Sequence, residues 1–122
     1  MDENLDWVRE FPGAITICDA AGTILSLNAR ACRTFEREGG AGLVGRNVLD
    51  CHPEPARTKL RAMLERGEPN VYTIEKGGAH KLICQSPWYR DGKYAGFVEL
   101  SLEIPAALPH FVRAARKPLP PA

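Results

Sequence analysis

The sequence has almost no net charge, few aromatic residues and no long apolar run. A net charge of +1 over 122 residues gives no overall field that would attract nucleic acid or an anionic membrane. No apolar stretch approaches the length that crosses a bilayer, and the acidic opening MDENLDWVRE is unlike a signal peptide. We therefore expect no nucleic-acid partner, no membrane and a cytoplasmic location.

Metal-ligand spacings and catalytic groupings are also missing. The four cysteines and three histidines show none of the paired spacings typical of zinc sites, and the haem-attachment motif C-x-x-C-H is absent. Cys51 and His52 are adjacent, so their side chains point in different directions and do not form a ready nucleophile–base pair. We expect reduced thiols rather than disulfides, and no enzymatic activity.

What is present is the composition of one ordinary globular domain, with 44% hydrophobic and 25% charged residues. The pattern of strands and helices breaks at Pro105. Beyond it, LPHFVRAARK over residues 108–117 predicts a short basic helix, and KPLPPA is too rich in proline to be ordered alone. We divide the chain into an N-terminal cap segment (1–12), a domain (13–104) and a C-terminal helix with a disordered tail (105–122).

Residues 70–104 carry the clearest structural signal. Three runs rich in β-branched and aromatic residues are separated by Gly77-Gly78 and by Asp91-Gly92. These dipeptides accept positive φ and suit the tight turns that join antiparallel strands. The segment therefore predicts a meander of three antiparallel strands.

A second hairpin is predicted near the N-terminus. The apolar run AITICD (14–19) is followed by the turn AAG and by TILSL (23–27). Both faces of AITICD are apolar, with Ile15 and Ile17 on one side and Ala14, Thr16 and Cys18 on the other. A strand of this kind is expected at the centre of a sheet, where both faces are covered.

Helices are predicted between and before the strands. Asp6 is a candidate cap for a short helix that ends at Phe11-Pro12-Gly13, and Asn28 is a candidate cap for a helix over 29–37. The longest helix is expected over 56–66, where apolar residues recur on one face and Gly67 stands at the C-cap position. Strands and helices that segregate in this way indicate an α+β domain.

Three segments follow one another in the same order as in a known family: ICDAAGTILSLNARACRTF, LVGRNVLD and SPWYRDGKYAGFVELSLEI. On these segments the chain resembles a PAS domain over residues 11–104. GRNVLDCHP and the helix after it are similar to the PAS module of some bacterial hemerythrin-like proteins. The resemblance implies an α+β PAS fold. Its five-stranded antiparallel sheet has the order 2-1-5-4-3, with short helices and one longer helix on one face.

The resemblance implies sensing or protein association rather than catalysis. PAS domains either hold a small molecule between helices and sheet, here expected to be a small apolar ligand or a cofactor, or have a filled core and dimerise; both alternatives are open at this point. On the last strand Val98, Leu100 and Leu102 alternate with polar residues, so we expect the even-numbered side to face inward. The expected cavity residues are Thr16, Cys18, Phe35, Val48, Leu60, Met63, Leu64, Val98 and Leu100.

The identity of a cofactor is open. Flavin photosensors of this fold carry a reactive cysteine in a motif resembling GRNCRFL, where this chain has Val48, and an amide side chain where it has Val98. Flavin is therefore not expected. The position of the haem-ligating histidine on the long helix corresponds to Leu60, which cannot ligate iron, so His52 is the remaining haem candidate.

Association is expected to use the face of the sheet that the helices leave open. The candidate dimer contacts are Trp7, Val8, Ile15 and Ile17. We expect a homodimer through this outer face and the N-terminal segment, with a separate effector protein as a further partner.

Overall fold

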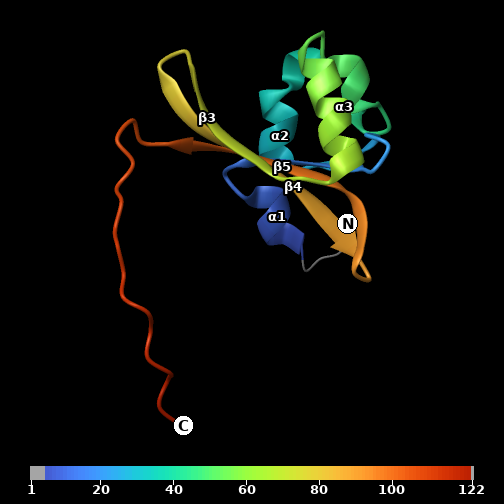
Figure 1. The fold of residues 1–122 in the computed structure, drawn as a ribbon. Helices are drawn as coiled ribbons and strands as arrows, with labels where there is room; N and C mark the ends of the chain where they lie inside the picture. Colours follow the sequence, from blue (N-terminus) through green and yellow to red (C-terminus); the bar gives the residue numbers. More distant parts are fainter. Residues whose placement is uncertain (1–4, 122) are drawn as a thin grey trace.

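The computed structural model describes residues 5–121 and contains a five-stranded antiparallel sheet (Figure 1). The strand order is β2-β1-β5-β4-β3, so two hairpins that are distant in sequence meet where β1 pairs with β5. This confirms the predicted strand order and the central position of β1. The strands are β1 Ala14–Asp19, β2 Ile24–Leu27, β3 Asn70–Lys76, β4 Ala79–Arg90 and β5 Lys93–Ile104.

Two tight turns join the three long strands where the sequence predicted them. Gly77 and Gly78 have φ values of 60° and 81° between β3 and β4, and Asp91 and Gly92 have φ values of 52° and 77° between β4 and β5. Positive φ at both central residues is the geometry whose twist matches antiparallel strands. The meander is therefore closed by local backbone preferences.

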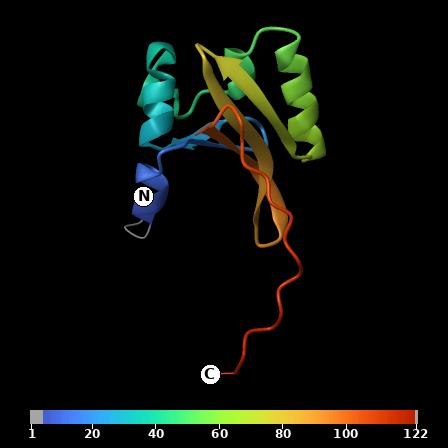
Figure 2. The ribbon, with the colours of Figure 1, turned by 90° about the vertical axis from the view of Figure 1, so that its left-hand side faces the viewer.

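Helices α2 (Ala29–Thr34) and α3 (Ala56–Arg66) lie over one face of the sheet, and α1 (Asp6–Glu10) lies toward the opposite face (Figures 1 and 2). Three short 3-10 helices connect α2 to α3. They are η2 Glu36–Glu38, η3 Gly40–Leu43 and η4 Val48–Cys51. None of the helices described in residues 5–121 is long and apolar enough to cross a membrane.

The longest helix, α3, ends as predicted and packs its apolar side on the sheet. Gly67 follows it in the left-handed conformation, and its N–H donates to the Met63 carbonyl at 2.9 Å. Leu64 is only 5% exposed and packs in one cluster with Cys18 of β1 and Phe97 of β5. The core of the domain therefore lies between α3 and the two central strands.

Asn28 joins three parts of the chain through its side chain. Its Oδ1 accepts from the N–H groups of Ala31 and Ile15, at 3.0 and 2.9 Å. Its Nδ2 donates to the carbonyls of Val8 and Gly13, each at 2.9 Å. The predicted helix cap is confirmed, and the same side chain also links α1 to the start of β1.

Two predicted helix boundaries are wrong. Asp6 is the first residue of α1 rather than its cap, and no side chain caps this helix. Helix α2 ends at Thr34 instead of residue 37. After it the chain tightens into η2, where the Glu38 N–H bonds to the Phe35 carbonyl, three residues back, as in a 3-10 turn.

The register of β5 shows which of its residues face the helices. In antiparallel strands, directly opposed residues share a face. Cys18 lies opposite Phe97 and Thr16 opposite Glu99. The odd-numbered residues Phe97 and Glu99 therefore face α2 and α3.

The prediction that Val98, Leu100 and Leu102 face the helices is wrong. Val98 lies opposite Ile17 and Leu100 opposite Ile15, on the outer face of the sheet. The prediction assumed that the polar residues of β5 face water. In the folded protein the polar Glu99 faces inward, because it has a hydrogen-bonding partner on β4.

The predicted C-terminal helix over residues 108–117 does not form. Residues 105–121 contain no helix, and the chain extends away from the sheet (Figure 1). Phe111 is 72% exposed and Val112 is 92% exposed, so the apolar side of this segment has nothing to pack on. A helix this short is marginal in water without tertiary contacts.

Candidate ligand-binding site

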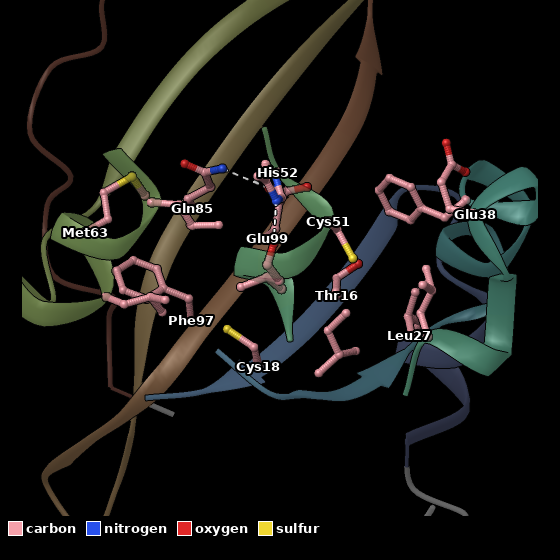
Figure 3. Close-up of a pocket in the computed structure, with 16 residues that line it drawn as sticks. Thr16, Cys18, Leu27, Glu38, Cys51, His52, Met63, Gln85, Phe97 and Glu99 are labelled. Atoms are coloured by element: carbon pink, nitrogen blue, oxygen red, sulfur yellow. Dashed lines mark hydrogen bonds between the residues drawn. The ribbon is translucent and has the colours of Figure 1, made fainter. Parts of the chain in front are cut away.

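A cavity of about 260 Å³ lies between the helices and the inner face of the sheet (Figure 3). Its floor comes from β1, β2, β4 and β5, and its walls come from α3 and from the segment between α2 and α3, η4 included. The lining residues are Thr16, Cys18, Ile24, Leu27, Phe35, Glu38, Leu43, Val48, Cys51, His52, Leu60, Met63, Leu64, Gln85, Phe97 and Glu99.

Most residues expected in the cavity line it. The structure brings together Thr16, Cys18, Phe35, Val48, Leu60, Met63 and Leu64. Val98 and Leu100 lie on the other face of the sheet. Since Val98 faces outward, its identity carries no information about flavin, and the expectation against flavin depends on Val48 alone.

The sequence analysis missed the polar residues of the floor, Gln85 and Glu99, and the aromatic Phe97. They come from strands whose register is set by a shift between Trp88 and Tyr89, where one strand carries an extra residue. One signal was available: Phe97 follows Gly96, and a glycine inside a strand often marks a close approach of two backbones.

Polar side chains form a row across four strands, β3, β4, β5 and β1, on the inner face. Gln85 Nε2 donates to Glu99 Oε2 at 2.8 Å. Gln85 Oε1 in turn accepts from Asn70 Nδ2 at 3.1 Å, and Thr16 lies beside Glu99 on β1. The row fixes the Glu99 carboxylate at the floor of an otherwise mainly apolar cavity.

His52 lies at the solvent side of the cavity, directly after η4. Its Nδ1 is 2.6 Å from the Val48 carbonyl oxygen. A carbonyl can only accept, so Nδ1 carries the proton and Nε2 of the neutral ring keeps a free lone pair. This is the tautomer in which Nε2 is able to bind a metal ion.

The two thiols of the cavity differ in their surroundings. Burial raises the pKa of the Cys18 thiol, and the charges of Asp19 and Glu99 raise it further, against a backbone hydrogen bond from Phe97. Cys18 therefore stays protonated and unreactive at neutral pH. Cys51 is exposed, and its Sγ lies 3.7 Å from the Asn47 carbonyl. Within residues 5–121, no group of three or more metal-ligating side chains is present.

The candidate dimer residues lie apart from the cavity. Ile15 and Ile17 are half-buried on the outer face of β1. Trp7 on α1 is 69% exposed, while Val8 is half-buried and its carbonyl accepts from Asn28. The outer face and α1 thus present apolar groups away from the cavity.

The outer face is connected to the cavity through a backbone carbonyl. Trp88 lies opposite Gly96, and its Nε1 reaches past this glycine to donate to the Cys18 carbonyl at 2.9 Å. The Cys18 side chain lines the cavity on the other face. One residue of β1 therefore contacts both sides of the sheet.

These features define a class of protein: an α+β domain with a small, partly open cavity between its central sheet and the flanking helices. No family model and no curated protein matches the chain. Solved structures of PAS domains do match. The chain has the PAS fold.

Three of these structures illustrate the likeness. A structure of the Aer2 receptor from Vibrio cholerae, described as a dual PAS-haem oxygen sensor, has a TM-score of 0.62 and 22% identity, covering 76% of this chain and 95% of that chain. The PAS domain of Bordetella pertussis BvgS has a TM-score of 0.59 and 16% identity, covering 85% of this chain and 88% of that chain. The PAS domain of the histidine kinase ThkA has a TM-score of 0.56 and 20% identity, covering 73% of this chain and 96% of that chain.

Proposed function

We propose that this chain is a sensory PAS module that binds a small ligand in its cavity and signals through protein association. The observation that carries the proposal is the cavity itself, a hollow of about 260 Å³ with mainly apolar walls and a few fixed polar groups. That is close to the lower end of the roughly 300–1,000 Å³ of small-molecule sites. The hollow favours this reading over the alternative of a ligand-free module with a filled core.

The neighbours support a sensory role, since they include a receptor and a histidine kinase. We assign a binding role rather than a catalytic one. The two candidate reacting groups are not paired with each other: Cys51 Sγ lies against the Asn47 carbonyl, and His52 Nδ1 bonds to the Val48 carbonyl.

A cavity-filling variant tests the proposal. Leu60→Trp on α3 places an indole in the cavity, and we expect native mass spectrometry to show at least a tenfold lower bound fraction of any co-purifying molecule. Val71→Trp is the matched control, because Val71 is 58% exposed on β3 and lies outside the cavity. A bare mass for the freshly purified wild-type protein contradicts ligand binding, as does equal occupancy in both variants.

Haem is a second candidate ligand, favoured by the geometry of His52. Histidines that bind metal through one ring nitrogen commonly donate the other N–H to a carbonyl, as His52 does to Val48. When bound, a haem iron would supply a site for a diatomic gas. Haem remains second because the cavity lining includes no lysine or arginine to pair with its propionates.

His52→Ala tests the haem candidate. If His52 is the axial ligand, the variant binds added haemin at least about tenfold more weakly, a loss of roughly 1.4 kcal/mol, and its Soret band shifts. His80→Ala is the control, since His80 lies on β4 beside Glu75 and outside the cavity. Identical titrations for His52→Ala and the wild-type protein contradict ligation by His52.

The associating partner in this proposal is a second copy of the chain. Trp7, Ile15 and Ile17 offer apolar surface on α1 and the outer face, next to the strand that lines the cavity. Light scattering over a concentration series measures the mass. A monomer throughout would contradict the dimer and leave a separate effector protein as the partner.

A further inference from the structure

We propose that the ligand of this cavity is a small cation with an apolar body, an amine or amidine, whose charged group pairs with Glu99. This inference rests on the proposed function, because it names the chemical class of the molecule that the cavity binds. It is carried by the charges of the lining, by the hydrogen bonds of Glu99 and by the apolar groups around it.

The charged side chains of the lining are of one sign. Glu38 and Glu99 contribute carboxylates, and the lining contains no lysine or arginine. Glu38 is exposed, so Glu99 is the half-buried charge of the lining, and its carboxylate attracts cations and repels anions.

Glu99 is held with one oxygen engaged and one available. A carboxylate only accepts hydrogen bonds, so the amide nitrogen of Gln85 faces Oε2, and the bond from Asn70 to Gln85 Oε1 fixes that orientation. Within residues 5–121 no hydrogen bond reaches Glu99 Oε1. Figure 3 shows the Glu99 side chain among the lining residues, between Gln85 and Thr16.

The ion pairs of the described chain do not involve Glu99. A half-buried carboxylate without a cationic partner gains a strong, charge-assisted hydrogen bond when an ammonium or amidinium enters. Beside the polar Gln85 and Thr16, the same lining contains apolar groups from Cys18, Met63, Leu64 and Phe97. An aromatic ring such as Phe97 adds a face that is attractive to cations. The site thus combines one anionic anchor with a mainly apolar surround.

The experiment compares benzylamine, benzyl alcohol and phenylacetate, which share an aromatic body and differ in charge. We expect calorimetry to give a Kd for benzylamine at least about tenfold lower than for benzyl alcohol, with no binding of phenylacetate. Glu99→Gln keeps an acceptor for Gln85 and removes only the charge. This variant should therefore reduce the preference for benzylamine over benzyl alcohol to less than about threefold, and its melting temperature should be unchanged.

Glu103→Gln is the matched control. Glu103 lies on β5 opposite Lys81, on the same face as Glu99 but outside the cavity, and its removal should leave the preference intact. If benzyl alcohol or phenylacetate binds as tightly as benzylamine, the inference that the ligand is a cation is overturned. The proposed function still stands in that case, provided that Leu60→Trp abolishes the binding. Absence of binding by all three probes, together with a bare native mass, overturns both.

Discussion

Gly96→Ala should destabilise the protein by about 4 kcal/mol or more, a loss large enough to unfold many domains of this size. Gly96 has a φ of 149°, a conformation that side chains rarely adopt. An alanine Cβ would overlap the Cys18 carbonyl oxygen and come within 2.7 Å of the Asp19 backbone. These atoms belong to β1, so relief requires separating the two central strands.

Urea unfolding followed by circular dichroism measures the effect of Gly96→Ala. The control is Gly42→Ala, because Gly42 has no atom within 4 Å of an added Cβ and no positive φ. We expect that control to change the free energy of unfolding by less than about 0.5 kcal/mol. A loss below about 1 kcal/mol in Gly96→Ala would show that β1 and β5 are not packed as described.

The second large effect is expected from Asn28→Ala, which should lower the free energy of unfolding by about 3 kcal/mol. Losing a helix cap alone costs roughly 1 kcal/mol. Asn28 is only 3% exposed, and its removal also leaves the Gly13 carbonyl and the Ile15 N–H without their side-chain partner. Each buried polar group left without a partner adds about 1–3 kcal/mol, and partial overlap of these costs brings the total near 3.

Asn47→Ala measures the stability lost with a helix cap alone, without the further loss from buried backbone groups that lose their partner. Asn47 caps η4 through Leu49 and donates to the Ala21 carbonyl, but it is more exposed than Asn28. We expect thermal or urea unfolding to show a loss of about 1 kcal/mol for this variant. Equal losses in the two variants would contradict the role of Asn28 as a buried junction between α1, β1 and α2.

Much of the site could be predicted from residues that act over short distances. The two-sided apolarity of Ala14–Asp19 predicted a central strand, and the one-face spacing in Ala56–Arg66 predicted the helix that covers it. Together they placed Thr16, Cys18, Leu60 and Leu64 beside one space, where the cavity lies. The direction of these side chains follows from their own elements.

The remaining site residues depend on contacts between distant segments. Whether Phe97 or Val98 faces the helices depends on pairing with β1 and on the register shift at Trp88, neither of which alternation along β5 reveals. Glu99 is tolerated inside because Gln85, fourteen residues earlier, donates to it. Polarity alone therefore gave the wrong face for this strand.

By itself the sequence determined the turns at Gly77-Gly78 and Asp91-Gly92, the cap at Asn28 and the end of α3 at Gly67, because each depends on the backbone of a few neighbouring residues. Only the tertiary structure decided which face of β5 lines the cavity and that residues 108–117 stay extended. These outcomes depend on the free energy of packing against partners far away in the chain, which local patterns do not contain.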